Sequence, residues 1–299
     1  MTENTIAEQA SSGQVPEKRL EIAHFTDPMC FWCYAMEPEV RKIRMLLDGK
    51  LDYRIVMGVL SSDVQDFGGN DDWSEMQYSF FRIELADHLT KAAAQVGMPF
   101  AADYLQSCSP EELVSLPMCK AYCAMKMLDE GCAEVYLRRM RECVFAEGRG
   151  LGTTDQLVEL AEEFPVDAVR FRTILETDEM EPILAEGLSE CHDWGVTAFP
   201  TLLMQYGDSR LIISGYCSYQ QLRQAILQVT GGAVDPGEAT YSLEELEAYM
   251  ERFGKAAARE IKVMFSLDDD QLADAIMDLV STGRYTTQSC QTSFFAVSR

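Results

Sequence analysis

Two cysteines separated by two residues, Cys30 and Cys33, stand where a strand-like segment gives way to a helical one. Residues 20–26 alternate apolar and polar side chains, which is typical of a β-strand. Apolar residues then recur every three or four positions over about residues 30–47, which predicts a helix with one buried face. Residues 51–59 alternate again. A strand, a helix and a strand within about 40 residues predict a parallel βαβ unit with a right-handed crossover.

The start of a helix is a favourable place for thiol chemistry. Unpaired backbone N–H groups and the helix dipole stabilise a thiolate there, so we expect Cys30 to have the lower thiol pKa and to be the exposed nucleophile. Cys33 lies one turn further along the same face, so we expect it to be buried and to resolve the mixed disulfide that Cys30 forms. Glu37, four residues later, is a candidate acceptor for the Cys33 proton, with a solvated acid as the alternative. Pro38 predicts a kink in the helix.

Other uses of a C-x-x-C pair fit this sequence less well. A structural zinc site needs four ligands, and the other close pairs, Cys119/Cys123 and Cys191/His192, lack the usual spacing. Covalent haem attachment requires a histidine directly after the second cysteine, where this chain has Tyr34. We therefore expect neither a metal nor a cofactor, and an inert buried pair of cysteines is the remaining alternative.

Packing explains the other candidate side chains more simply than chemistry does. Cys119 and Cys123 are four residues apart on a predicted helix. A second redox pair is conceivable there, but small buried hydrophobic side chains are the favoured interpretation. His24 precedes the cysteine pair on the first predicted strand, where we favour a packed histidine over a catalytic base.

The charge of the chain limits its partners. Lys and Arg total 25 against 49 Asp and Glu, which gives a formal net charge of −24. Nucleic acids and anionic lipids are bound through an excess of basic residues, so we expect no nucleic-acid or membrane partner. The chain has no run of about 18 apolar residues, and its polar start lacks the apolar core of a signal peptide. We therefore expect a cytoplasmic protein whose ten cysteines are mostly reduced.

Changes of pattern divide the chain into several parts. Helical patterns fill residues 61–195, strand patterns return near residue 201, and Pro236-Gly237 marks a linker. Beyond it, three helical patterns and a terminal hairpin predict a winged-helix-like module. The predicted parts are a disordered tail at 1–18, an α/β domain formed by 19–60 and 196–230, an inserted helical domain at 61–195, a linker at 231–241 and a C-terminal module at 242–299.

Several of these segments resemble the DsbA family of thioredoxin-fold proteins. The resemblance rests on the segment D-P-M-C-F-W-C-Y at 27–34, the helical insertion and the segment V-T-A-F-P-T at 196–201, and it covers about residues 19–230. Within the family the chain is similar to a cytoplasmic branch, the FrnE-like oxidoreductases and the SpxH (YjbH) adaptors of the ClpXP protease. The resemblance implies an α/β thioredoxin fold with a large helical insertion, followed by a small C-terminal winged-helix-like module.

The resemblance also implies roles for individual residues. Pro200 would be a cis-proline facing the cysteine pair, and the backbone of Phe199 would hold an extended substrate segment. Glu37 would be the buried acid of the fold. Phe31 and Trp32, between the two cysteines, would contact the substrate and tune the redox poise.

Three functions follow as hypotheses. The first is a thiol–disulfide oxidoreductase that exchanges disulfides with protein thiol substrates, glutathione or a thioredoxin-type reductant through Cys30 and Cys33. The second is an adaptor that presents a regulatory protein to the ClpXP protease, with residues 242–299 as a partner-binding surface and the cysteines as a redox-sensitive or zinc-sensitive switch. The third is a glutathione-linked isomerase of the same fold.

Overall fold

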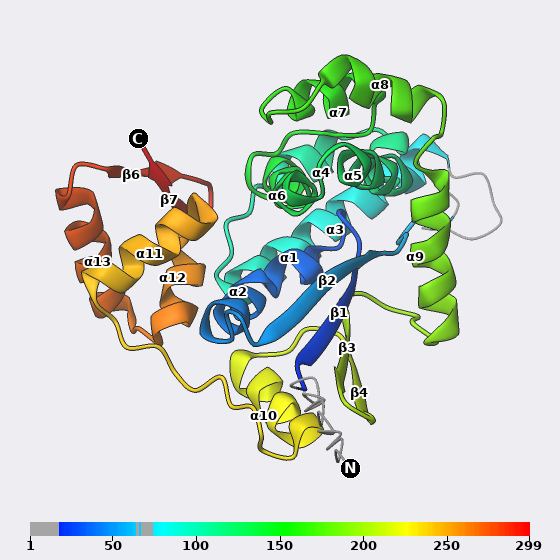
Figure 1. Ribbon diagram of the computed structural model, residues 1–299. Coiled ribbons are helices and arrows are strands. Elements are labelled where there is room, and N and C mark those ends of the chain that lie inside the picture. Colours follow the sequence, from blue (N-terminus) through cyan, green and yellow to red (C-terminus); the bar gives the residue numbers. More distant parts are fainter. Residues whose placement is uncertain (1–17, 64–65, 67–73) are drawn as a thin grey trace, which may run out of the picture.

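The computed structural model describes residues 18–63, 66 and 74–299 (Figure 1). Residues 1–17, which make up nearly all of the predicted tail, lie outside the described residues, and so does the predicted glycine-rich loop at 68–71. In the described part of the chain, every helix is too short or too polar to cross a membrane.

A four-stranded mixed sheet contains the segments on both sides of the insertion. Its order is β2-β1-β3-β4. β1 pairs with β2 in parallel, while β3 is antiparallel to both β1 and β4. The predicted βαβ unit is present, and the strand patterns near residue 201 correspond to β3 and β4. The strands are β1 (Leu20–Thr26), β2 (Leu51–Met57), β3 (Thr201–Tyr206) and β4 (Ser209–Ser214).

Helices cover both faces of this sheet. Successive side chains of β1 point to opposite faces, so they pack against different helices. Ile22 faces α2 (Glu37–Leu46) and α10 (Tyr219–Thr230), whose apolar side chains form one core cluster with it. Phe25 faces the opposite side, where it packs near Cys191 of α9 (Glu181–Asp193).

The helix that follows the cysteine pair is interrupted. The sequence predicted one kinked helix over residues 30–47, but the structure has α1 (Phe31–Ala35) and then α2, which share Met36 as a cap. Pro38 lies in the first turn of α2, where its missing N–H has no intrahelical partner to lose. The interruption turns the chain directly behind the cysteine pair.

The insertion is a stack of helices with one large core above the sheet (Figure 1). Tyr136, Phe171 and Phe100 are among its fully buried aromatic side chains. Its long helices lie where the sequence predicted them. Besides α9, the helices and helical turns of the insertion are α3 (Glu75–Val96), α4 (Asp103–Ser107), the 3₁₀ turn η2 (Glu111–Leu113), α5 (Leu116–Leu128), α6 (Glu130–Arg141), the π-helical turn η3 (Glu142–Ala146), α7 (Thr154–Ala161) and α8 (Ala168–Glu176).

The C-terminal module packs against α2 through α12, beside the sheet domain (Figure 1). Its elements follow one another as a helix, a strand, two helices and two strands, as in a winged helix, and its sheet has the order β5-β7-β6. The sequence missed β5, whose three residues are too few to show an alternating pattern. The elements are α11 (Leu243–Phe253), β5 (Lys255–Ala257), α12 (Ala258–Phe265), α13 (Asp269–Ser281), β6 (Tyr285–Ser289) and β7 (Phe294–Ser298).

The predicted boundaries between the parts of the chain remain predictions. The contact between α12 and α2 nevertheless means that the module is built onto the sheet domain, and the stretch between Gly231 and Ser242 connects them without regular structure.

Candidate active site

The cysteine pair lies at the start of α1, as the sequence predicted. Cys30 is the N-cap residue, and its Sγ accepts a hydrogen bond from the backbone N–H of Cys33 at 3.3 Å. Both cysteines are free thiols. Cys30 is 5% exposed and Cys33 is 0% exposed. Cys30 is therefore the more accessible of the two sulfurs, although it is far less exposed than a surface nucleophile.

A loop from the other end of the fold faces Cys30. The Sγ of Cys30 lies 3.4 Å from the carbonyl oxygen of Phe199, and the peptide bond between Phe199 and Pro200 is cis. Gly58, at the end of β2, leaves room for the Phe199 ring, because a Cβ at this glycine would lie 2.1 Å from the ring. The structure thus brings together the two motifs that the sequence singled out, 169 residues apart.

The two residues between the cysteines differ in exposure. Phe31 is 4% exposed and packs edge-on against Phe100 and Phe145 of the insertion. Its ring is therefore covered by the insertion and is not available to contact a substrate, contrary to the prediction. Trp32 is half-buried, and its ring lies 6.0 Å from that of Tyr216. Trp32 can contact a substrate, and Phe31 instead anchors the cysteine helix to the helical insertion.

Glu37 does not have the properties of a proton acceptor. Its carboxylate is paired with Arg138 and accepts a hydrogen bond from Nη1 of Arg141 at 2.7 Å. Burial alone would raise the pKa of this carboxyl, but the two arginine charges outweigh burial and bring the pKa to about 2. A group with this pKa takes up no proton near neutral pH. The proposed role of Glu37 as acceptor is corrected to that of a buried ion-pair partner.

The two thiols interact through a hydrogen bond between their side chains, so the pKa of each depends on the protonation of the other. The hydrogen bond between the two side chains, together with burial, raises the pKa of Cys30 well above its usual range. Burial also acts to raise the pKa of Cys33. The Cys30 thiol, the His24 ring and the charge of Arg141 nevertheless stabilise its thiolate and lower that pKa. The hydrogen bond between the two side chains thus stabilises a single negative charge on the reduced pair.

His24 is the side chain that the sequence analysis undervalued. It is 2% exposed, and its Nδ1 is hydrogen bonded to the Tyr53 hydroxyl at 2.6 Å. Its Nε2 is buried and has no hydrogen-bond partner among the described residues, while the ring stabilises the thiolate of Cys33. In the sequence, the indication of this role was the position of His24 on the strand that leads to the cysteine pair. In the structure, this position faces α2.

Asp27 fixes the turn before the pair. It is fully buried, and its carboxylate oxygens accept hydrogen bonds from the backbone N–H groups of Met29 and Leu60, with N···O distances of 2.7 Å. Burial raises its pKa. The Cys119 Sγ lies 3.4 Å from the same carboxylate, so Cys119 supports the turn.

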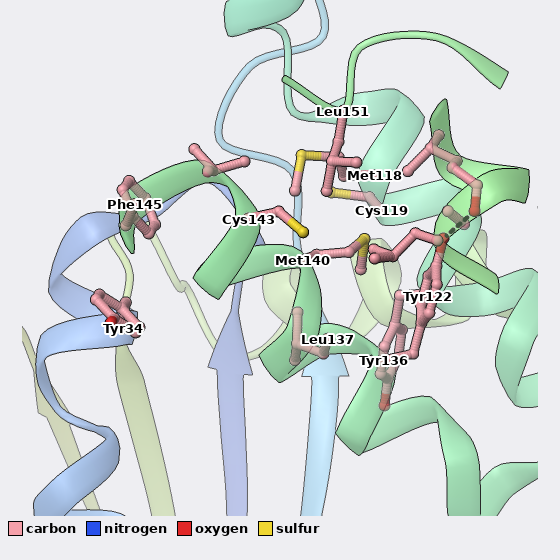
Figure 2. Close-up of a cluster of buried hydrophobic side chains, with 14 of the residues drawn as sticks. Tyr34, Met118, Cys119, Tyr122, Tyr136, Leu137, Met140, Cys143, Phe145 and Leu151 are labelled. Carbon is pink, nitrogen blue, oxygen red and sulfur yellow. Dashed lines mark hydrogen bonds between the residues drawn. The ribbon is translucent and has the colours of Figure 1, made fainter. Parts of the chain in front are cut away.

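Three other cysteines of the insertion, Cys119, Cys123 and Cys143, are buried. Cys119 and Cys143 lie in the apolar cluster between α5 and α6, surrounded by Met118, Met140 and Leu151 (Figure 2). Burial raises the pKa of Cys143 to about 12, and that of Cys123 likewise to about 12. These thiols stay protonated, as small buried hydrophobic residues do. No group of three or more potential metal ligands occurs in the described part of the chain.

A model of a protein family, described as thioredoxin, matches residues 24–224, which is more than half of the chain. This match spans the strand before the cysteines, the whole insertion and the helix after the cis-proline loop.

The chain belongs to the thioredoxin family.

Among solved structures, members of this fold align over most of the present thioredoxin-family chain. A protein from Nitrosomonas europaea, proposed to be a protein disulfide isomerase, is 19% identical with a TM-score of 0.57, over 72% of this chain and 100% of that chain. The cytosolic disulfide reductase DsbM from Pseudomonas aeruginosa is 19% identical with a TM-score of 0.52, over 78% and 97% of the two chains. These likenesses establish the thioredoxin fold with its helical insertion.

Characterised relatives extend the similarity into the C-terminal module. The ClpXP adapter protein SpxH from Bacillus subtilis is 23% identical over 262 residues, 86% of this chain and 82% of the relative. SpxH from Bacillus licheniformis is also 23% identical, over 265 residues. The thioredoxin-family chain is thus similar to adaptors over most of its length and to disulfide oxidoreductases in its fold.

Proposed function

We propose that the protein catalyses thiol–disulfide exchange through Cys30 and Cys33. The observation that carries this proposal is the arrangement of the reduced pair. The more accessible Cys30 Sγ lies at a helix N-terminus beside the carbonyl of Phe199, and it accepts a hydrogen bond from the backbone N–H of Cys33 in the same turn. A helix N-terminus favours the thiolate form of a cysteine, which is the form that attacks a disulfide.

The exchange balances as two substitutions at sulfur. Cys30 loses its thiol proton to solvent, and the resulting thiolate attacks one sulfur of a substrate disulfide. A mixed disulfide forms, and one substrate thiolate leaves and takes up a proton. The Cys33 thiolate then attacks the Cys30 sulfur, so that the second substrate thiol leaves and a Cys30–Cys33 disulfide remains. Two electrons have passed to the substrate, and an external thiol reductant returns them.

The substrates are protein disulfides, and the reductant is glutathione or a thioredoxin-type dithiol. Phe199, Pro200 and Trp32 would hold the substrate chain beside the sulfurs. A cytoplasmic location is part of the proposal. It is supported by the ten free thiols.

Thiol counting in defined redox buffers tests the proposal. The protein is equilibrated at increasing ratios of oxidised to reduced glutathione, quenched with acid and alkylated. We expect the number of free thiols to fall by two in one step, and peptide mapping to place the bridge between Cys30 and Cys33. Because Cys119 and Cys123 are buried with little thiolate, they should stay alkylatable after unfolding. A bridge between other cysteines, or none at any ratio, would overturn the proposal.

We also infer that His24 exchanges a proton with Cys33 during resolution. Because the His24 ring stabilises the Cys33 thiolate, His24→Phe should raise the pKa of Cys33. The absorbance of the thiolate, titrated in a Cys30→Ala background, measures this shift. His192→Phe is the matched control, since His192 is exposed and far from the pair in the sequence. Equal titration curves for the two variants would remove His24 from the mechanism.

The adaptor function is the second candidate, and the similarity to SpxH over 86% of the chain favours it. In that case the protein presents a regulatory protein to a protease, and the cysteines are a switch. A pull-down with the double variant Cys30→Ala/Cys33→Ala separates the two functions. Undiminished capture of a partner by a variant that has lost exchange activity would favour the adaptor. The glutathione-linked isomerase would require saturable glutathione binding beside Pro200.

A further inference from the structure

Tyr216 is in contact with both motifs of the candidate active site. Its ring lies 6.0 Å from the ring of Trp32, which stands between the two cysteines. The residue before it, Gly215, donates its backbone N–H to the carbonyl oxygen of Pro200 at 2.8 Å. Trp32 and Tyr216 are both only partly buried. Two aromatic rings with accessible surface therefore lie next to the cysteine pair and the cis-proline loop.

A buried carboxylate holds the hydroxyl of Tyr216. The hydroxyl donates a hydrogen bond to Oε1 of Glu39 at 3.0 Å. Glu39 lies in the first turn of α2 and is 1% exposed. The same oxygen accepts a hydrogen bond from Nη2 of Arg259, also at 3.0 Å, while Oε2 has no hydrogen-bond partner among the described residues. A buried carboxylate is unfavourable without a cation, so the charge of Arg259 allows Glu39 to occupy this position.

Arg259 comes from the C-terminal module, where it lies in the first turn of α12. Its aliphatic stem passes the end of α3, because a Cβ on Gly97, the C-cap of that helix, would lie 3.6 Å from the Cδ of Arg259. Arg259 thus contacts the insertion with its stem and α2 with its guanidinium. The module therefore contributes a side chain that is two hydrogen bonds away from an aromatic ring of the active site.

We propose that Arg259 is a positioning residue for the proposed exchange reaction. Through Glu39 it holds the Tyr216 ring against Trp32, and the two rings form a subsite for an apolar or aromatic side chain of the substrate. The substrates are then protein or peptide disulfides whose cysteine is flanked by apolar residues. This inference rests on the proposed exchange through the cysteine pair, to which it adds the substrate class and a part played by the C-terminal module.

Exchange with two peptide dimers tests the subsite. Each dimer consists of two identical peptides joined through their single cysteine, which is flanked by Phe in one dimer and by Ser in the other. Attack on either sulfur of such a dimer is equivalent. Reduced protein is mixed with excess dimer and quenched with acid, and the disulfide between Cys30 and Cys33 is quantified by mass spectrometry. We expect the second-order rate constant to be about tenfold higher for the Phe dimer, because of its contacts with the two rings.

Arg259→Met should remove most of this preference. The concentration of the Phe dimer that gives half the maximal rate should rise about fivefold as the ring contacts are lost. The maximal rate and the exchange with the Ser dimer should stay unchanged, because the cysteine pair is not altered. Arg259→Lys keeps the charge and should restore part of the preference. Tyr216→Phe keeps the ring but loses the hydroxyl, so it should reproduce Arg259→Met and decides the question if that variant does not fold.

Arg252→Met is the matched control. Arg252 also comes from the module and pairs with Asp48, just after α2, at 3.0 Å, but it takes no part in the hydrogen bonds around Glu39. This variant should keep the full preference. An unchanged preference in Arg259→Met and Tyr216→Phe, an equal loss in Arg252→Met, or equal exchange of both dimers by the parent protein would overturn the inference alone. A parent protein that exchanges neither dimer would overturn the proposed exchange, and this inference with it.

Discussion

Replacing Glu260 by Gln should lower the free energy of unfolding by about 3 kcal/mol, the effect expected when one partner of a buried ion pair is removed. Glu260 is 0% exposed, and its carboxylate lies 3.0 Å from Arg138 and 3.1 Å from Arg41. Neutral glutamine leaves both guanidinium groups short of an anion in a site that water does not reach. Urea denaturation measures the loss.

Glu159→Gln is the matched control for this substitution. Glu159 is 70% exposed and pairs with Arg149 at the surface. Surface ion pairs contribute less than about 1 kcal/mol, so this variant should unfold almost as the parent protein does. If Glu260→Gln is no more destabilised than the control, the buried cluster does not hold the C-terminal module to the sheet domain.

The cluster around Glu260 joins three parts of the chain. Glu260 comes from the C-terminal module, Arg138 from the insertion, and Arg41 from the helix behind the cysteines. Arg138 also binds Glu37. Because these contacts are buried, we expect the module and the sheet domain to unfold together, and the urea transition to stay a single step.

Local patterns were enough to predict the scaffold of the site. The strand before Cys30 and the helix after it are set by alternating and three-to-four-residue spacings, which act over a few residues. The predicted helix begins at Cys30, and in the structure Cys30 is the N-cap of that helix. Pro38 predicted a disturbance of the helix, although the sequence did not predict that it lies in the first turn of a second helix.

Electrostatics could not be predicted in the same way. The arginines that fix the ionisation of Glu37 come from positions 101 and 104 residues further along the chain, so no spacing rule connects them. The same applies to Phe31, which is buried by Phe100 and Phe145 of the insertion. The expectation for the two cysteine pKa values took account of the helix terminus alone, whereas their mutual hydrogen bond, His24 and Arg141 also act on the pair.

The second large effect concerns the lifetime of the mixed disulfide. Cys33 attacks the Cys30 sulfur within the same molecule, and a well-placed intramolecular group has an effective concentration on the order of 10⁵ M or more. Glutathione at millimolar concentration cannot replace it. In Cys33→Ala the mixed disulfide should therefore persist at least about a thousandfold longer than in the parent protein.

Trapping with the two single-cysteine variants tests the exchange mechanism most directly. Each variant is incubated with a disulfide-bonded model protein, quenched with acid and analysed for covalent complexes by mass spectrometry. We predict that Cys33→Ala accumulates a complex linked through Cys30, and that Cys30→Ala accumulates none. Equal trapping by the two variants, or a complex linked through another cysteine, would contradict the assignment of Cys30 as the nucleophile and Cys33 as the resolving thiol.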